Sequence, residues 1–389
     1  MNPPLHQTIL ALQQLKINDK IIESVLTDSE DSNYDTFQKI CENLSRDPAN
    51  KAKDLSRDSV EKAWERALEI STISRQRTIR ILSRFDSGFP RLLKNIPNSP
   101  LLLHVKGNAA ILNSGCVAVV GTRIPLEYSR NKALEISQSL VKTGFTVVSG
   151  LAKGIDAAAH EGALQARGHT IAVLAHGLQT IYPAGNSELA SRIIENGGAL
   201  ISEYPWYTAL EPWRLVQRDR IQSGLSLGVF VIETSIKGGT MHTVDFCKKQ
   251  NHILAVLNHP REFSSNESIS GNVDLIKKSG NKANFIVYTP GEEFDRISER
   301  FKEFGKESPG STNIQISLMD DSPPEMENTN TTTTFAGFTT AAKLRSVERG
   351  LVTPEESVEK KLKSQKTRKP IKTARTRPTP EMASDQKTL

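Results

Sequence analysis

Two short segments of the sequence combine glycines with hydroxyl or basic side chains, which are groups that bind phosphate. One is Gly121-Thr122-Arg123, and the other runs from Ser149 to Asp156, with Lys153 placed before a glycine. Glycine lets backbone amides approach an anion closely, and a helix that follows adds the positive end of its dipole. Both segments could therefore contact a phosphate group, although many α/β proteins have glycine turns of this kind with no anion.

Two later segments could contribute to the same kind of site. Arg218-Asp219-Arg220 is expected to be a loop, and its arginines could clamp a nucleic-acid backbone, because guanidinium groups bind phosphate oxygens and stack on bases. The alternative is an arginine pair salt-bridged to Asp219 or Glu233. The segment from Lys237 to Thr243 again places glycines and hydroxyls before a helix, and it could close one pocket with the others.

Patterns typical of several enzyme classes are absent from these segments. Neither glycine-rich segment before residue 160 matches GxGxxG or GxxxxGK[ST], so hydride transfer and ATP hydrolysis lose support. His160, His176 and His242 have no HExxH, CxxC or paired-carboxylate context, and His160 is expected to pack within a helix. We therefore expect no catalytic residue, no metal site and no cofactor.

The glycine-rich segments follow elements that read as buried parallel strands. Valine-rich apolar runs end at or before glycine at 116–121, 145–150, 170–177 and 227–233. Helical patterns are expected between them at 126–144, 156–167 and 186–196, each ending near a glycine. This alternation predicts an α/β fold with a Rossmann-like, doubly wound, mostly parallel sheet. Asp156 is expected to cap the second helix.

Three regions are expected along the 389 residues. Residues 1–84 are predicted to form a small helical domain, which we interpret as a packing or protein-contact module rather than a nucleic-acid reader because its charges are mixed. Residues 85–290 are predicted to form the Rossmann-like domain. Residues 291–389 are predicted to be a linker and a disordered basic tail, since Lys360–Arg377 holds nine Lys or Arg and no acid.

Composition excludes some locations. No apolar run approaches the roughly 18 residues of a transmembrane helix, and the first residues lack the pattern of a signal peptide. The three cysteines, an odd number without CxxC spacing, fit neither a disulfide framework nor a zinc ribbon. We expect a cytoplasmic protein with no membrane association.

Read in order, these segments resemble the DNA-processing protein A family (DprA, also called Smf). The matching text is VAVVGTR, VVSGLAKGIDAAAHEGAL, TIAVLAHGLQTIYPAGNSEL, GGALISEYP, RDRIQSGLS and GGTMHT, and the resemblance covers about residues 85–285. It implies a non-enzymatic protein that binds single-stranded DNA, forms a homodimer and loads a RecA-type recombinase during natural transformation or recombination. Carried over by position, the DNA-binding residues would be Gly121, Thr122, Arg123, Ser149, Gly150, Lys153, Gly154, Arg218, Arg220, Gly239, Thr240 and Thr243.

The chain also departs from the family pattern. The family commonly has Arg-Asn-Arg where this sequence has Asp219 between two arginines, and it usually has Ser-Gly-Ser where this sequence has Gly238-Gly239-Thr240. The winged-helix domain of many relatives is expected to be absent. The alternative function is a nucleotide sensor or a phosphoribohydrolase-like enzyme of the wider Rossmann-like group, but the third glycine and the following glutamate of those enzymes are missing here.

Overall fold

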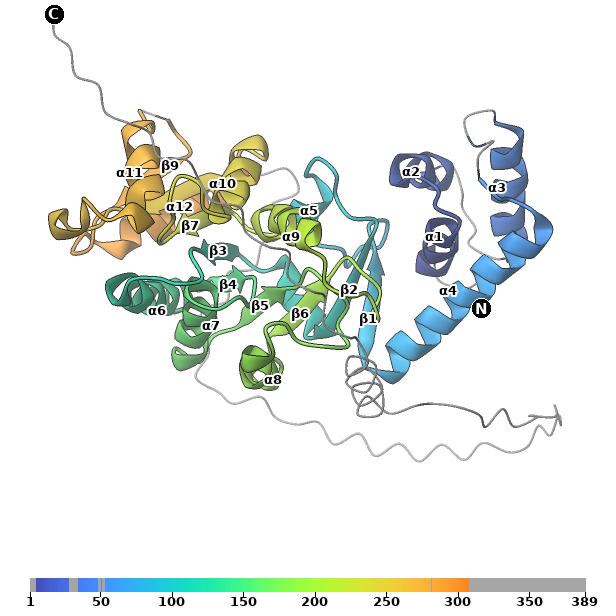
Figure 1. Ribbon diagram of the computed structural model, residues 1–389, viewed down its shortest axis with the longest axis horizontal. Helices are drawn as coiled ribbons and strands as arrows, with labels where there is room; N and C mark the ends of the chain where they lie inside the picture. Colours follow the sequence, from blue (N-terminus) through green and yellow to red (C-terminus); the bar gives the residue numbers. More distant parts are fainter. Residues whose placement is uncertain (1–4, 28–33, 48–49, 51–52, 281, 308–389) are drawn as a thin grey trace, which may run out of the picture. The chain divides into compact units, whose positions relative to one another are not determined.

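The computed structural model describes residues 5–27, 34–47, 50, 53–280 and 282–307 of the chain (Figure 1). The expected basic tail therefore lies outside the described residues. Among the described residues, no helix combines the length and the apolar character needed to span a membrane.

The N-terminal region is helical, as predicted. Its helices are α1 (Leu5–Gln14), α2 (Asp19–Thr27), α3 (Tyr34–Arg46) and α4 (Arg57–Gln76). Ser56 caps α4, because its hydroxyl accepts a hydrogen bond from the backbone N–H of Ser59. The helices share an apolar core in which Phe37 stacks on Trp64 with 5.2 Å between ring centroids. Ile81, Leu101 and Leu102 belong to the same core, so these helices pack against one end of the sheet.

One mixed sheet of nine strands forms the centre of the α/β region. Its order is β1-β2-β6-β5-β4-β3-β7-β8-β9, in which β1 with β2 and β2 with β6 are antiparallel and all other pairs are parallel. The strands are β1 (Ile79–Ser83), β2 (Leu102–Gly107), β3 (Cys116–Val120), β4 (Thr146–Ser149), β5 (Thr170–Val173), β6 (Ala199–Ser202), β7 (Gly228–Val231), β8 (Ile253–Leu257) and β9 (Phe285–Tyr288).

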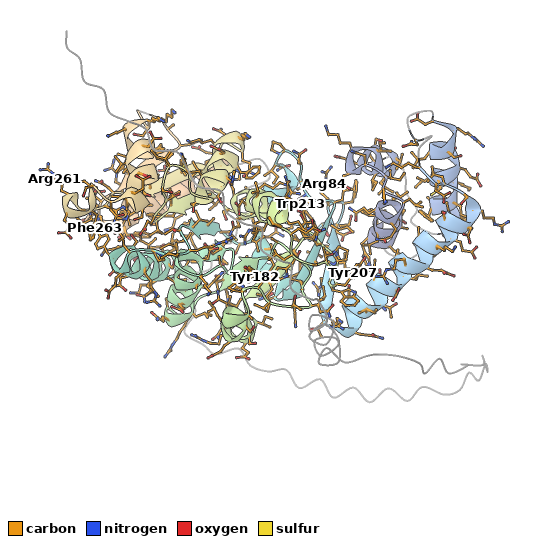
Figure 2. All side chains as sticks on the ribbon, viewed as in Figure 1. Arg84, Tyr182, Tyr207, Trp213, Arg261 and Phe263 are labelled. Atoms are coloured by element: carbon orange, nitrogen blue, oxygen red, sulfur yellow. The ribbon has the colours of Figure 1, made fainter. Side chains whose placement is uncertain are left out.

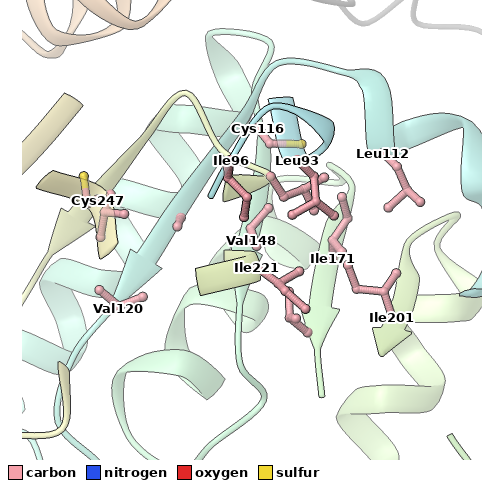
Figure 3. Close-up of a cluster of buried hydrophobic side chains, with 14 of the residues drawn as sticks. Leu93, Ile96, Leu112, Cys116, Val120, Val148, Ile171, Ile201, Ile221 and Cys247 are labelled. Carbon is pink, nitrogen blue, oxygen red and sulfur yellow. The ribbon is translucent and has the colours of Figure 1, made fainter. Parts of the chain in front are cut away.

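Helices cover both faces of this sheet, which is the doubly wound arrangement predicted (Figure 1). One face packs against α6, α7 and α12, and the other against α5, α9, α10 and α11; Figure 3 shows Leu93, Ile221 and Cys247 in the second layer. The helices after β1 are α5 (Arg91–Lys94), α6 (Glu127–Lys142), α7 (Ile155–Gln165), α8 (Ser187–Glu195), α9 (Pro212–Gly224), α10 (Thr240–Lys249), α11 (Ser270–Lys277) and α12 (Phe294–Glu307).

The strand order reverses between β3 and β7. From β3 the chain moves outward through β4 and β5 to β6, and it then returns to place β7 on the other side of β3. In open α/β sheets, the crevice at such a reversal, beyond the carboxyl ends of the strands, is where ligands bind. The fold therefore selects the loops after β3 and β7 as the walls of a site.

Two parts of the structure differ from the sequence interpretation. Residues 79–83, which we placed in the helical region, form the edge strand β1 and pair with β2. Residues 294–307, which we assigned to linker, form α12, because Ile297 and Phe301 lie on one side of that helix and are buried against the sheet. The domain limits themselves remain a prediction.

Candidate nucleic-acid-binding pocket

A pocket of about 480 Å³ lies at the reversal point of the sheet. It brings together the segment after β3, the first turn of α7, one side of α9 and the segment between β7 and α10. We call it the switch-point pocket, and its lining residues are Val120, Gly121, Thr122, Arg123, Ile124, Ala152, Asp156, Pro212, Leu215, Val216, Arg218, Asp219, Gln222, Thr234, Ser235, Gly238, Gly239, Thr240, His242 and Thr243.

The segment after β3 supplies a cation to this pocket. The backbone N–H of Thr122 donates to the carbonyl of Glu233 (2.9 Å), which ties this segment to the end of β7. Arg123 is exposed, and within the described residues its side chain forms no hydrogen bond or ion pair. Ile124 beside it is 86% exposed. A free guanidinium group next to an exposed apolar side chain suits a ligand with both phosphate and base.

The segment between β4 and α7 packs against the Thr122 segment and contributes few lining residues to the pocket. Ser149 is buried, and its hydroxyl donates to the carbonyl of Val119 (2.7 Å), so it is not available to a ligand. Gly154 has a φ of +78°, and a Cβ there would meet the carbonyl oxygen of Thr122 at 2.5 Å. Lys153 is exposed but lies outside the lining residues. Apart from Ala152 and Asp156, this segment is a scaffold for the Thr122 segment.

Asp156 does not cap α7 in the way we predicted. The N-cap is Gly154, and Asp156 lies in the first turn, where its carboxylate accepts hydrogen bonds from the N–H groups of Gly150 (3.1 Å) and Ala152 (3.4 Å). Burial raises the pKa of Asp156, and the nearby Arg218 opposes that rise. Its carboxylate holds the preceding turn closed.

Arg218 and Arg220 lie in α9 rather than in a loop, because Pro212 begins a helix that continues to Gly224. Both are buried. Arg218 donates to the carbonyls of Gly150 (2.8 Å) and Val173 (2.5 Å) and pairs with Asp219 (3.2 Å). The side chain of Arg218 thus joins the ends of two strands while it lines the pocket.

Arg220 is outside the pocket. Its guanidinium forms a two-pronged pair with Glu203 (3.0 and 2.5 Å) and donates to the carbonyl of Asn98 (3.0 Å). The sequence also allows an internal ion pair between these arginines and Asp219 or Glu233. Arg218 does pair with Asp219, whereas Arg220 uses Glu203 instead.

Asp219 gives the pocket a titratable acid. Burial raises its pKa to about 6; the adjacent Arg218 lowers it and the negative charge of Asp156 raises it further. Since Asp219 lines the pocket, a bound phosphate would experience its charge above that pH.

The segment between β7 and α10 forms the opposite wall. Thr243 is buried at the second turn of α10, and Gly239 is the N-cap residue, with no side chain capping the helix. The first turn of α10 contains no acidic residue. The N–H groups of Met241 and His242 donate to the carbonyls of Gly238 (3.0 Å) and Gly239 (3.1 Å), so the positive end of the helix dipole is what this turn presents to the pocket.

The structure thus brings seven of the predicted site residues to one pocket: Gly121, Thr122, Arg123, Arg218, Gly239, Thr240 and Thr243. It does not bring Ser149, Gly150, Lys153, Gly154 or Arg220 into the lining. Sequence reasoning missed the apolar wall of α9, Pro212, Leu215 and Val216, which the pattern of that helix could have indicated. Trp213, labelled in Figure 2, is 53% exposed on the same first turn.

Two further features of the described residues concern metal ligation and the environment of His160. Among the described residues, no group of histidine, cysteine and acidic side chains could hold a metal ion. His160 is buried in α7, as we expected, with its Nδ1 2.7 Å from the hydroxyl of Thr170, and burial lowers its pKa to about 3.

The family model described as DNA recombination-mediator protein A matches residues 80–290, which is more than half of the chain. The chain belongs to this family. Its fold is similar to the X-ray structure of DNA processing protein A from Streptococcus pneumoniae, with a TM-score of 0.61, 26% identity, and coverage of 76% of this chain and 98% of that one.

Curated relatives support the same membership. The chain is 40% identical over 190 residues to Protein Smf of Synechocystis, covering 48% of each chain. It is 30% identical over 242 residues to DNA processing protein DprA of Bacillus subtilis, covering 61% of this chain and 80% of that one. The match thus spans about half the length of the Synechocystis relative.

Proposed function

We propose that this DprA-family protein binds single-stranded DNA in the switch-point pocket and delivers the strand to a RecA-type recombinase. The observation that carries the proposal is that one pocket is lined both by Arg123, whose side chain has no hydrogen bond or ion pair within the described residues, and by the N-terminus of α10, which no side chain caps. Together they offer a guanidinium fork and the positive end of a helix dipole to the phosphates of one strand.

The pocket also contains surface for the bases. The apolar lining residues include Ile124, Leu215 and Val216. Such side chains can pack against bases that are exposed in a single strand. A paired strand keeps its bases inside the double helix. This supports a preference for single strands over double strands.

In this proposal, each predicted site residue has a definite role. Arg123, Thr122, Gly239, Thr240 and Thr243 contact the strand, and Lys153 attracts it from outside the pocket. The positioning residues, whose polar groups or close packing serve neighbouring parts of the chain, are Gly121, Ser149, Gly150, Gly154, Arg218 and Arg220.

The remaining parts of the proposal rest on family membership. We propose that the protein acts without catalysis, in the cytoplasm, as a homodimer, during natural transformation or recombination. The segments before residue 80 and after residue 290 lie outside the matched region, so their contribution is proposed separately below.

One observation favours the alternative of a nucleotide-binding enzyme. The carboxyl groups of Asp156, which is buried, and Asp219, which is partly buried, line one pocket and have raised pKa values; such pairs serve as acids and bases in enzymes. Both carboxylates already accept hydrogen bonds, Asp156 from a backbone N–H and Asp219 from Arg218. These hydrogen bonds favour a structural role for both residues.

Titration of labelled oligonucleotides tests both functions. Single-stranded DNA, double-stranded DNA and RNA are titrated at two salt concentrations, and a nucleoside monophosphate is incubated with the protein and analysed for cleavage. Tight single-strand binding with the nucleotide intact supports the proposal. Cleavage of the nucleotide with no strand preference contradicts it.

A further inference from the structure

A second cationic site lies where the helical region meets the edge of the sheet. The sequence between Glu69 and Asp86 contains four arginines and no acidic residue. They occupy the last turn of α4, the turn that follows it, β1 and the residue after that strand: Arg75, Arg77, Arg80 and Arg84. This concentration of charge is not used by the switch-point pocket.

Two of these arginines have partners inside the protein. The guanidinium of Arg77 lies over the ring of Trp206, 4.6 Å from its centroid. Arg84, labelled in Figure 2, forms an ion pair with Glu23 of α2. Within the described part of the chain, the side chains of Arg75 and Arg80 form no hydrogen bond or ion pair.

The two unpartnered arginines line the same pocket. We call it the junction pocket; it has a volume of about 350 Å³ and is lined by His6, Ser71, Arg75, Thr78, Ile79, Arg80 and Ile81. Its residues come from α1, α4, β1 and the turn between them, and none is acidic. Its volume lies near the lower end of the roughly 300–1,000 Å³ that small ligands occupy.

The position of Arg80 argues for a ligand. The dipole at the end of α4 stabilises Arg75, so that residue alone would need no other partner. Arg80 lies on a strand, where no such dipole acts, and it is the one exposed position of β1. Arg75 and Arg80 line one pocket that has no acidic lining residue, so their like charges repel and a bound anion would offset that repulsion.

The hydroxyl of Ser71 is an independent observation that points to a ligand. Its hydroxyl oxygen is buried and has no hydrogen-bond partner in the described structure, whereas buried polar atoms normally have one. His6 faces the same pocket; burial lowers its pKa, Asp86 opposes that shift and Arg75 adds to it. A neutral imidazole and a hydroxyl are both suited to bind an oxyanion through hydrogen bonds.

We propose that the junction pocket binds a phosphate group, with Arg75 and Arg80 as its charged partners and Ser71 and His6 as hydrogen-bond partners. The phosphate belongs either to the backbone of a bound nucleic-acid strand or to a small phosphate ion or ester. The first source rests on the proposed function, and the second does not.

The experiment uses the full chain and two probes. Thermal unfolding is measured in inorganic phosphate and in chloride of equal ionic strength, and single-stranded oligonucleotide is titrated at several salt concentrations. The variants are Arg80→Ala, Arg75→Ala and the conservative Arg80→Lys. Arg192→Ala, an exposed arginine of α8 with no side-chain bond in the described structure, is the matched control.

We expect phosphate to raise the unfolding temperature of the wild type above its value in chloride, because a ligand that binds only the folded state stabilises it. Arg75→Ala and Arg80→Ala should weaken the apparent phosphate affinity about tenfold, as expected for loss of one charged hydrogen-bond partner. Arg80→Lys should retain most of the effect, and Arg192→Ala all of it.

The oligonucleotide arm distinguishes the sources. If the site holds a backbone phosphate, Arg80→Ala lowers the logarithmic salt slope by about 0.7. If it holds a small phosphate, Arg80→Ala leaves oligonucleotide binding unchanged while it reduces the thermal shift caused by phosphate. Two results would overturn the proposal when oligonucleotide binding is also unchanged in the alanine variants. One is equal unfolding curves of the wild type in phosphate and in chloride, and the other is an equal phosphate-induced shift in the wild type and both alanine variants. Absent oligonucleotide binding by the wild type contradicts only the proposed function.

Discussion

At the scale of single residues, the carboxyl group of Asp219 offers the most direct test of phosphate binding in the switch-point pocket. Its pKa is about 6, so it is mostly ionised at pH 7 and becomes protonated as the pH falls below 6. A carboxylate repels a bound phosphate and a neutral carboxyl group does not. Single-strand affinity of the wild type should therefore increase between pH 7 and pH 5.5.

Asp219→Asn should bind single strands more tightly at pH 7 and lose most of that pH dependence. Asparagine can still accept the hydrogen bond of Arg218. The check is a titration of both proteins at each pH, in which the variant reports whatever pH dependence does not come from Asp219. Weaker binding by the variant would mean that the carboxylate orients Arg218 for the strand.

Substitution of Arg123 should affect DNA binding, whereas substitution of Arg218 should mainly affect stability. Arg123→Ala should change the free energy of unfolding by less than about 0.5 kcal/mol, because the side chain of Arg123 has no partner among the residues that the structure describes. It should also lower the logarithmic salt slope of single-strand binding by about 0.7. Arg218→Ala should cost about 3–5 kcal/mol, because it leaves Asp219 and two buried carbonyls without their donor. Urea unfolding with oligonucleotide titration measures both. Arg218→Ala with full stability but no binding would make Arg218 a direct strand contact.

At the scale of elements, the N-terminus of α10 can be tested without changing its packing. A Cβ at Gly239 would meet no atom within 4 Å, so Gly239→Asp and Gly239→Asn should both fold. The aspartate should stabilise α10 by about 0.3–1 kcal/mol, because its negative charge interacts favourably with the positive end of the helix dipole. It should also weaken strand binding, because its charge faces the phosphates, while asparagine should not. Equal binding by the two variants would remove α10 from the site.

The sequence predicts the elements whose signals are local. Apolar runs such as residues 116–120 predict buried strands, and Gly144, with a φ of +91°, ends α6 as expected. Burial of Arg218 is not predictable, because its carbonyl partners lie 45 and 68 residues earlier in the chain. The helix α12 does carry a local signal, with Phe294, Ile297 and Phe301 on one face, but the many charges around them resemble a linker.

At the scale of the whole molecule, we propose that the basic segment Lys360–Arg377 supplies non-specific attraction to nucleic acid, whereas the switch-point pocket supplies the preference for single strands. Removing the nine positive charges of Lys360–Arg377 from the net charge of +6 leaves −3, so the rest of the chain would approach a polyanion slowly. Those residues lie outside the described structure, and their proposed role rests on charge alone. Contacts made by such a segment are screened by salt and do not depend on strand number.

Strand preference after truncation tests the central claim, that the switch-point pocket reads single strands. A chain ending at Lys343 and the full chain are titrated with single- and double-stranded oligonucleotides at low and high salt. We expect truncation to lower affinity for both at low salt, to have little effect at high salt, and to keep or increase the preference for single strands. Loss of that preference with low-salt affinity intact would contradict the account, because the basic segment would then be the part that distinguishes single strands.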